Sequence, residues 1–324
     1  MRPKILVVGS LVMDLIVTTE RFCSAGESVI GCGFNTAAGG KGANQAVQAA
    51  RLGADVTMVG MVGNDDFGRN LINSAKESGV NTDYIFVTDN APTAVGNVQI
   101  QKNSEGTENR IIVVLGANFE LKAEDIASLE DKISNFDMVM LQHEIPKEVN
   151  LKVAKLAKAK GVPVMLNPAP AAEVEKEIIS CLTYISPNEH EAEAIVGIKP
   201  EGDDAIGKAV DRLHSMGVKN VLITLGKEGC AFSNGKTVIN SPSIDIAQVV
   251  DPTAAGDSFM GAFCTAVASG IAPEDALLFA NCTAGITVSK MGAQTSLPTF
   301  DEVMSLMTEK GYETEKFNVI NSKQ

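Results

Sequence analysis

The sequence contains no tryptophan, only 5% aromatic residues and only three histidines. Val, Ile, Ala and Gly dominate instead, and such residues fill a parallel β-sheet that helices cover on both faces. The histidines are His143, His190 and His214. They are scattered along the chain and form no ligand set with the cysteines, so we expect them to be structural or exposed.

None of the six cysteines belongs to a Cys-x-x-Cys pair, which is the spacing typical of zinc and redox sites. Most lie in apolar stretches, where a reduced cysteine behaves as a small hydrophobic residue. We therefore interpret them as reduced core residues and expect neither a disulfide framework nor a zinc site. The six are Cys23, Cys32, Cys181, Cys230, Cys264 and Cys282.

Positive charge is also scarce, since 27 Lys and Arg stand against 40 Asp and Glu, for a formal net charge of −13. This balance argues against a general role in binding nucleic acids or anionic membranes. An anionic substrate stays compatible with it, because local loops and metal ions can override the global charge.

No apolar run approaches the roughly 20 residues that span a bilayer. The run near the N-terminus is short and is typical of a first strand rather than of a signal peptide, so we expect a cytoplasmic protein. The length of 324 residues suits a single large domain, 1–324, that carries a small appendage.

Short apolar runs alternate with helical patterns along most of the chain. This alternation predicts an α/β fold with a central, mostly parallel sheet flanked by helices. One helix is predicted over about 65–78, and another ends at Gly53. The strands are predicted near 5–9, 56–63, 137–142, 162–166, 182–186 and 220–226.

Two segments, 11–36 and 93–115, break the alternation with short apolar runs between turn signals. They predict a small antiparallel sheet that projects from the main domain, and such an appendage is a good candidate lid. The last dozen residues, 313–324, are predicted to form a weakly ordered tail.

A glycine cluster at 38–46 runs directly into a helical pattern. Adjacent glycines let the backbone approach a ligand and leave N–H groups free at a helix start, while Lys41 and Asn44 add polar donors. Gly42 stands where a Walker A loop requires Ser or Thr, and no Gly-x-Gly-x-x-Gly follows the first strand. A glycine turn that merely caps the helix is the alternative to a ligand site.

A second small-residue loop, at 250–256, opens another helical pattern. The backbone N–H groups of Ala254, Ala255 and Gly256 would point above the helix start, where the helix dipole favours an anion. At the edge of this anion hole, Asp257 is placed to accept a proton from an attacking hydroxyl. The alternative is that Asp257 is only a carboxylate in the first helical turn.

AAGGKGANQA and DPTAAGDSF resemble the two signature regions of the PfkB (ribokinase-like) carbohydrate kinase family. Other motifs of the family follow in order along nearly the whole chain, among them GSLVMD, NPAP at 167–170, PNEHEAE at 187–193 and KMGAQTSLP at 290–298. The resemblance implies a ribokinase-like α/β fold with a β lid and an ATP-dependent sugar kinase.

By this resemblance, Asp257 is the catalytic base that deprotonates the sugar 5-hydroxyl for in-line attack on the γ-phosphate of ATP. The backbone of Ala254, Ala255 and Gly256 is the implied anion hole. D-ribose is the leading sugar, although Val12 replaces an Asn common in the ribose site. The implied sugar-binding residues are Asp14, Gly40, Lys41, Asn44, Glu144 and Asp257.

The resemblance also implies the remaining ligands. Glu191 would bind Mg²⁺ through water, and a K⁺-type monovalent cation would lie beside the anion hole, bound only by oxygen atoms. The implied ATP contacts are Asn188, Thr224, Gly226, Gly256 and Asn281. The implied cation ligands are Asp251, Thr253, Thr287, Lys290, Gly292 and Ser296. A homodimer through the lid sheets is implied in the same way.

Beside a ribose kinase, two other classes of acceptor and one non-catalytic role stay open. The acceptor could be a nucleoside, fructose or a keto-deoxy sugar. A sugar phosphate is a weaker candidate, because residues 11–36 offer only Arg21 as a basic residue. The third alternative is a non-catalytic binding protein on a kinase fold; the joint presence of Asp257, the small-residue loop, Asn188 and Glu191 argues against it.

Overall fold

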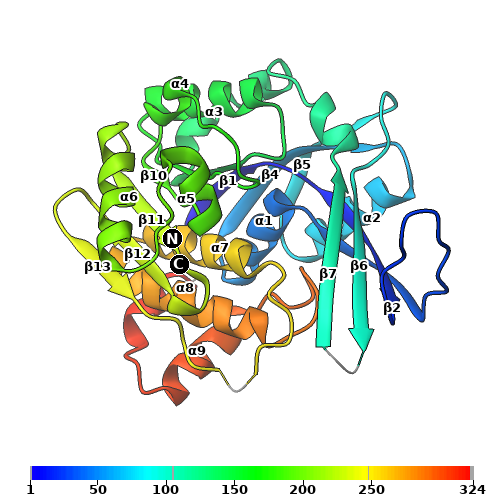
Figure 1. Ribbon diagram of the computed structural model, residues 1–324. Helices are drawn as coiled ribbons and strands as arrows, with labels where there is room; N and C mark the ends of the chain where they lie inside the picture. The colour runs from blue at the N-terminus through cyan, green and yellow to red at the C-terminus, as the bar shows by residue number, and fades with distance from the viewer. Residues whose placement is uncertain (1, 104–105, 247, 322–324) are drawn as a thin grey trace.

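The computed structural model describes residues 2–103, 106–246 and 248–321. Its largest element is a nine-stranded sheet in the order β13-β12-β11-β10-β9-β8-β1-β4-β5 (Figure 1). Neighbouring strands are parallel from β5 to β11, and β12 and β13 form an antiparallel edge. The bounds are β1 Lys4–Val8, β4 Asp55–Gly63, β5 Asn81–Thr88, β8 Met138–Gln142, β9 Val164–Asn167, β10 Tyr184–Ile185, β11 Asn220–Thr224, β12 Cys230–Ser233 and β13 Val238–Ser241.

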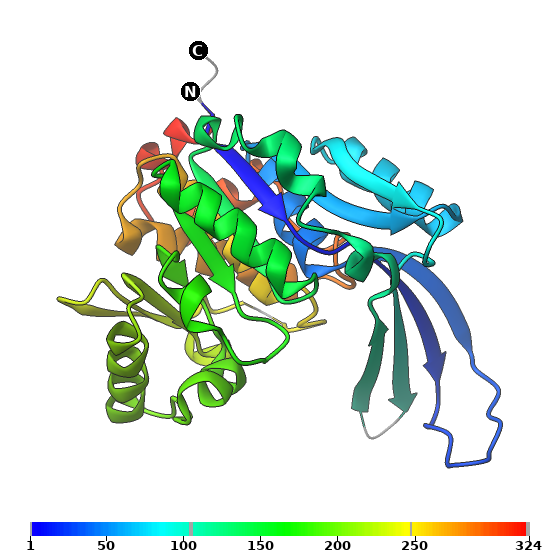
Figure 2. The same cartoon turned by 90° about the horizontal axis from the view of Figure 1, so that it is seen from above.

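Helices cover both faces of this sheet, as the sequence predicted. Strand β1 alternates between the two resulting cores, because Ile5 and Val7 point into one and Leu6 and Val8 into the other. Helices α1, α2, α7, α8 and α9 bury side chains in the first core, and α3, α4 and α6 in the second (Figure 2). The helix bounds are α1 Lys41–Arg51, α2 Asp66–Glu77, α3 Lys147–Ala159, α4 Lys176–Ile179, α5 Glu189–Val196, α6 Asp203–Ser215, α7 Ala255–Ala268, α8 Pro273–Val288 and α9 Phe300–Glu309.

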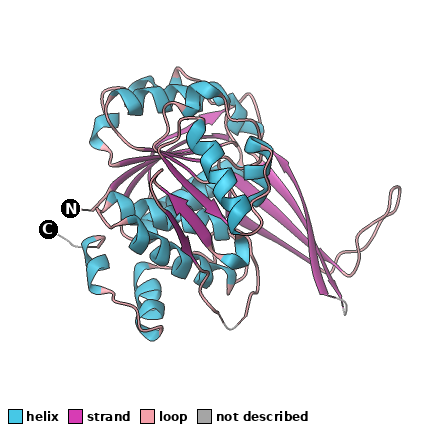
Figure 3. Ribbon diagram, turned by 60° about the vertical axis from the view of Figure 1, so that its left-hand side comes forward, coloured by secondary structure: helices cyan, strands magenta, loops and turns pink. Residues whose placement is uncertain are grey.

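A second sheet projects from this body, in the order β3-β2-β6-β7 (Figure 3). Its strands are β2 Val12–Thr19, β3 Gly33–Gly39, β6 Val95–Asn103 and β7 Gly106–Val114. The prediction of an antiparallel sheet is wrong for one pair, since β2 and β6 are parallel. The reason is the connection: β2 and β6 are separated by β3, α1, β4, α2 and β5, whereas the two antiparallel pairs are neighbours in sequence. Residues 104 and 105, which fall within the predicted lid segments, lie outside the described residues.

Two further expectations need correction. Cys181, Cys230, Cys264 and Cys282 are buried, and burial raises the pKa of both the Cys230 and the Cys282 thiols to about 12. Cys23 and Cys32, however, are exposed, because they lie in the loop at the far end of the small sheet, where no helix covers them.

The C-terminal segment is better ordered than the sequence predicted. After α9 it forms a 3-10 helix over Glu315–Val319, and the side chains of Phe317 and Ile320 are fully buried. The ring of Phe317 stacks on that of Phe279 at 5.1 Å between centroids, so burial of apolar surface fixes the segment. Residues 322–324 of the predicted tail lie outside the described residues.

Over the described ranges, no helix is both long and apolar enough to cross a bilayer.

His214 confirms the expectation of a structural histidine, because its ring nitrogens lie within hydrogen-bonding distance of the Val218 carbonyl and the Ser233 hydroxyl.

Candidate active site at the carboxyl ends of the strands

A cavity of about 600 Å³ opens at the carboxyl ends of β9, β10 and β11. Asn167 ends β9, Ser186 follows β10 and Thr224 ends β11, and all three line the cavity. Ligands of open α/β sheets bind outside the carboxyl ends of the strands, and this volume is typical of small-molecule sites.

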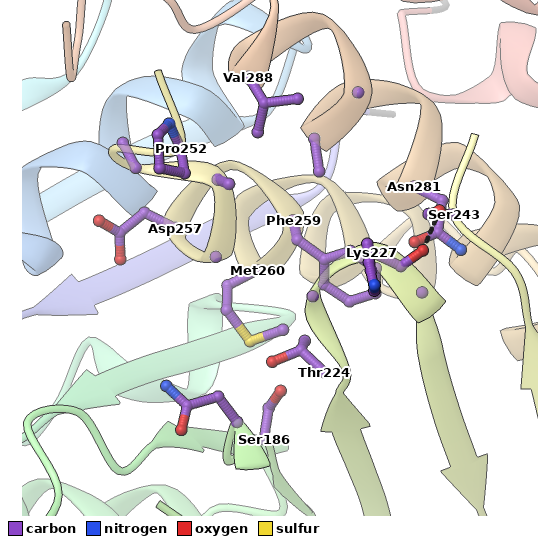
Figure 4. Close-up of a pocket in the computed structure, with 18 of the residues that line it drawn as sticks. Ser186, Thr224, Lys227, Ser243, Pro252, Asp257, Phe259, Met260, Asn281 and Val288 are labelled. Atoms are coloured by element: carbon purple, nitrogen blue, oxygen red, sulfur yellow. Dashed lines mark hydrogen bonds between the residues drawn. The ribbon is translucent and has the colours of Figure 1, made fainter. Parts of the chain in front are cut away.

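Both polar and apolar side chains line the cavity. Figure 4 shows Asp257 at one end and Asn281, Lys227 and Ser243 at the other. Phe259 and Met260, from the same helix as Asp257, project between the two ends. The further apolar lining comes from Ile244, Ile246, Val249, Ala284 and Val288.

The N-terminus of α7 forms one wall of the cavity. Ala254 precedes the helix with φ 61°, the left-handed region, which no other non-glycine residue of the described chain adopts. The Ala255 N–H donates to the Pro252 carbonyl at 3.2 Å. The N–H groups of Ala254, Gly256 and Asp257 have no partner among the described residues, and those of Gly256 and Asp257 lie at the positive end of the helix dipole. The free donors therefore include Asp257 itself, which the sequence analysis did not consider.

The Asp257 carboxylate is buried and held from helix α1. It accepts hydrogen bonds from Asn44 Nδ2 at 2.9 Å and from Gln45 Nε2 at 3.1 Å. The helices approach closely one turn later, where a Cβ on Gly261 would lie 2.8 Å from Cβ of Gln48. The two sequence motifs thus meet in space at Asp257.

Asp14 approaches the same region from the small sheet. A Cβ on Gly96 would lie 2.2 Å from its Oδ1, and a Cβ on Gly39 would lie 2.6 Å from its Oδ2, so only glycines leave room for this carboxylate. Burial and the nearby charge of Glu144 raise the pKa of Asp14 to about 6. Both effects disfavour the charged form.

Glu144, which follows β8, is anchored to the start of α1. It accepts from the Ser10 hydroxyl and, at 3.0 Å, from the backbone N–H of Lys41. Burial acts to lower the pKa of Lys41, but the carboxylates of Asp257, Glu144 and Glu191 raise it above its usual value. Lys41 lines the cavity, whereas Asp14, Gly40, Asn44 and Glu144 lie beside it.

Asn188 and Glu191 form a capping box at the start of α5. Glu191 Oε2 accepts from the Asn188 N–H at 2.9 Å, and Asn188 Oδ1 accepts from the Glu191 N–H at 2.8 Å. Burial raises the pKa of Glu191. Both residues line the cavity together with Thr224 and Gly226, so the structure brings these predicted nucleotide-site residues together.

At the far end of the cavity, Asn281 braces the segment that follows β13. Its amide nitrogen donates to Ser241 Oγ at 2.9 Å and to the Pro242 carbonyl at 3.1 Å. Asn281 therefore shapes this end of the cavity and also lines it.

Asp251 joins the two loops of the predicted cation site. Its Oδ1 accepts from the Thr253 N–H and its Oδ2 from the Gly292 N–H, both at 2.9 Å. The Thr287 carbonyl accepts from the Lys290 N–H at 3.1 Å. Thr287 and Ser296 are fully buried. Asp251 thus brings two of the predicted cation residues, Thr253 and Gly292, together, and none of the six lines the cavity.

Sequence reasoning missed several residues of this site. Ser10, Gln45, Asn167 and Lys227 all contact site residues or line the cavity. Each stands inside or next to a motif that was recognised, so adjacency to the motif was the available signal.

Comparison with known proteins agrees with this arrangement. Residues 2–300 match the pfkB family of carbohydrate kinases. The chain is 40% identical over 304 residues to a ribokinase of Bacillus subtilis, covering 94% of this chain and 99% of that one, and 36% identical over 308 residues to a ribokinase of Haemophilus influenzae, covering 95% and 99%. The structure of Arabidopsis thaliana ribokinase with ribose and ATP superposes with a TM-score of 0.87 at 36% identity, covering 95% and 99% of the two chains. The chain therefore belongs to the pfkB family of carbohydrate kinases.

Proposed function

We propose that this carbohydrate kinase transfers the γ-phosphoryl group of ATP to the 5-hydroxyl of D-ribose. The observation that carries the proposal is Asp257, a buried carboxylate beside unpaired N–H groups at the end of a nucleotide-sized cavity. The similar ribokinases of Bacillus subtilis and Arabidopsis thaliana support ribose as the acceptor.

Asp257 acts as the base in this reaction. Its carboxylate takes the proton of the sugar hydroxyl as the sugar oxygen forms a bond to the γ-phosphorus, and the bond from that phosphorus to the β,γ-bridging oxygen breaks. The products are ribose 5-phosphate and ADP. Asn44 and Gln45 hold the carboxylate in place, so little reorganisation is needed when the hydroxyl arrives.

The N-terminus of α7 stabilises the transferring group. The free N–H groups of Gly256 and Asp257 and the helix dipole supply positive potential where charge develops on the phosphoryl oxygens. The anion hole that we propose therefore comprises the N–H groups of Ala254, Gly256 and Asp257. It differs from the predicted hole of Ala254, Ala255 and Gly256 because the Ala255 N–H already donates to the Pro252 carbonyl. Lys41, kept charged by three carboxylates, adds a cation at the same end of the cavity.

Ribose lies between the small sheet and the start of α1. Asp14 and Glu144 accept hydrogen bonds from its hydroxyls, as carboxylates can from a vicinal diol. Asn44 Oδ1 is buried without a partner among the described residues, so it needs a donor such as a sugar hydroxyl. Gly40 and Lys41 complete this pocket from the turn before α1.

ATP occupies the cavity, with its phosphates near α7 and Asn188 and its base between the apolar walls near Asn281. Thr224 and Gly226 contact the nucleotide from the loop after β11. Glu191 fits a water-mediated Mg²⁺ site: it is a carboxylate on the cavity wall, and among the described residues no cluster of three acidic, His or Cys residues offers direct ligation. Mg²⁺ would there neutralise charge on the ATP phosphates.

The predicted potassium site also fits the residues present. Its donors are one carboxylate, one hydroxyl and backbone carbonyls, which suit a large, weakly hydrated cation. The ligands would come from Asp251, Thr253, Thr287, Lys290, Gly292 and Ser296. Asp251 already joins the two loops, so a K⁺ ion there would supply additional charge and rigidity next to the turn that begins α7.

We further propose that the small sheet is the lid of a single domain, 1–324, and that it pairs with a second copy in a homodimer. Its strands expose apolar side chains on both faces, including those of Phe34, Ile111 and Ile112. Closure over ribose would bury one face, and a second lid would cover exposed apolar surface and unpaired strand edges.

The replacement Asp257→Asn tests the mechanism, because it keeps the size of the side chain and removes its proton acceptance. We expect the turnover number to fall by roughly 10²- to 10⁴-fold while ATP still binds with little change. Turnover by coupled ADP release and ATP affinity by calorimetry measure the two effects. A folded Asp257→Asn enzyme with near-parental turnover would refute the assignment.

A further inference from the structure

The carboxylate of the proposed base, Asp257, accepts a hydrogen bond from a network of side-chain amides. Gln45 donates both of its amide N–H groups, one to Asp257 Oδ1 at 3.1 Å and one to Asn167 Oδ1 at 3.2 Å. Its own oxygen, Oε1, accepts from Gln142 Nε2 at 2.8 Å. Gln45 is 1% exposed and Gln142 is 0% exposed, so both of these amides are shielded from bulk water.

The surrounding groups fix the direction of every amide in this network. Asn167 donates its amide N–H to the Ser186 carbonyl at 2.9 Å, which leaves Asn167 Oδ1 facing Gln45. If the amide of Gln45 were reversed, its oxygen would face both that oxygen and the Asp257 carboxylate. Only one orientation therefore satisfies the network, and in it Gln45 must donate to the base.

Gln142 is in turn held tightly in place. Asn150 Nδ2 donates to its backbone carbonyl at 2.6 Å. A Cβ on Gly9 would lie 2.0 Å from Gln142 Oε1, so the glycine leaves the space that this side chain occupies.

The network is retained at a cost in stability. Gln142 Oε1 and Asn150 Oδ1 are buried and have no hydrogen-bond partner among the described residues. A partly satisfied buried network is less stable than an apolar core of the same volume.

We propose that Gln45, oriented by Gln142, is a positioning residue for phosphoryl transfer. It fixes the rotation of the Asp257 carboxylate by donating to Oδ1, which leaves the other oxygen directed away from Gln45. The inference rests on the proposed function, because it assumes that Asp257 is the base. The other charged groups that couple to this carboxylate are Lys41 on α1 and Glu191 on α5, with Glu144 acting on Lys41, and the variants below leave all three unchanged.

The main test is Gln45→Met, which keeps the side-chain length and removes both donated bonds. We expect kcat to fall roughly 10- to 100-fold, because a hydrogen bond to a charged group is lost. The KM values for ribose and ATP should stay within about threefold, since Gln45 is buried and does not line the cavity. At saturating substrates, the acid limb of the kcat–pH profile should also move to higher pH.

A matched control is available on the same helix. Gln48 is also fully buried and donates its amide N–H to the Pro298 carbonyl at 2.9 Å, away from Asp257. Gln48→Met should lower the melting temperature to an extent similar to Gln45→Met, yet leave kcat and the acid limb unchanged. If both variants lowered kcat to the same extent, the effect would be a general one of losing a buried hydrogen bond, and the inference would be overturned.

Gln142→Leu is a second test that leaves Gln45 in place. If Gln45→Met folds poorly, Gln142→Leu alone tests the inference, and a parental kcat in this variant would overturn it. Gln142→Leu should lower kcat about 3- to 10-fold by releasing Gln45, and it should cause no further loss in the Gln45→Met background, because it acts through Gln45. If the two losses in kcat add fully in the double variant, Gln142 does not act through Gln45, and the inference is overturned.

Asp257→Asn separates the failure of this inference from failure of the proposed function. If Asp257→Asn is inactive while Gln45→Met keeps parental kcat and acid limb, the positioning role is wrong and the base assignment stands. If Asp257→Asn keeps parental turnover, the base assignment itself is wrong.

Discussion

The two sheets of the molecule differ in how their apolar residues are covered. The central strands of the nine-stranded sheet are buried on both faces, as at Leu6 and Val7. The small sheet instead leaves Phe34 and Ile112 each 65% exposed. The large sheet therefore carries its own core, and Asp257 and the cavity lie beside that core. The small sheet carries Asp14, and its exposed apolar side chains become buried only when another surface covers them.

Under the proposed function, the two sheets would serve separate parts of catalysis. Changes around the large sheet should alter turnover, and changes in the small sheet should alter sugar binding and the response to ligand. The predictions below test that division.

The largest expected effect in the small sheet is that of Asp14→Asn. The ribose KM should rise by about 100-fold, because a charged acceptor of sugar hydrogen bonds is lost, while the KM for ATP should stay nearly constant. Initial-rate kinetics with each substrate varied separately measure both. An equal rise in both KM values would contradict the division between the sheets.

The same replacement should stabilise the protein at neutral pH. The pKa of Asp14 is raised from 3.8 to about 6, so the folded state binds the proton more tightly than the unfolded state. Parental stability should therefore fall as pH rises from about 4 to 6, and above that range Asp14→Asn should be more stable by roughly 2 kcal/mol. Urea unfolding at pH 4 and pH 8 measures this, and equal stability of the two proteins at pH 8 would contradict it.

The pKa of Asp14 also predicts a pH effect on sugar binding. Below about pH 6 the carboxyl is protonated and loses acceptor capacity, so the ribose KM should rise as pH falls through this value. In Asp14→Asn this rise should be absent. A parental ribose KM that stays constant between pH 5 and pH 8 would refute the role of the charged form.

A moderate effect is expected from the loop beside α7. Turnover should rise several-fold with KCl and not with an equal concentration of tetramethylammonium chloride, and Asp251→Ala should blunt this response. Asp251 links Thr253 and Gly292, so its removal loosens the proposed site. Full turnover in buffer free of K⁺ and NH₄⁺ would leave Asp251 as a loop brace only.

A smaller change should appear in the dynamics of the small sheet. Backbone hydrogen exchange in β2, β6 and β7 should slow about 10-fold at saturating ribose, because closure excludes water from these strands, while exchange in β1 and β8 should stay the same. Mass spectrometry of peptic fragments measures both regions. Unchanged exchange in the small sheet would contradict a closing lid.

Much of the large sheet could be predicted because its strands are continuous apolar runs. The helix predicted over 65–78 is confirmed as Asp66–Glu77, with Asp65 capping it by accepting from the Gly68 N–H at 2.8 Å. Such signals are local, since a buried strand or a capped helix depends on residues next to one another in the chain.

What could not be predicted depends on contacts between distant residues. The parallel pairing of β2 with β6 is not encoded in either strand alone, and the order of the C-terminal segment depends on Phe317 packing against Phe279. In the site, Asn44 and Asp257 were identified by their motifs, but the bond from Gln45 to Asp257 joins residues 212 positions apart and carries no local pattern.

The central claim is that this site phosphorylates ribose, and a panel of acceptors tests it most directly. ADP release should be measured with ribose, fructose, a keto-deoxy sugar, a nucleoside and ribose 5-phosphate, with the product identified by ³¹P NMR. The account predicts that ribose has the highest kcat/KM and that phosphate appears on its 5-oxygen. A much higher kcat/KM for a nucleoside or another sugar, or phosphate on a different oxygen of ribose, would contradict it.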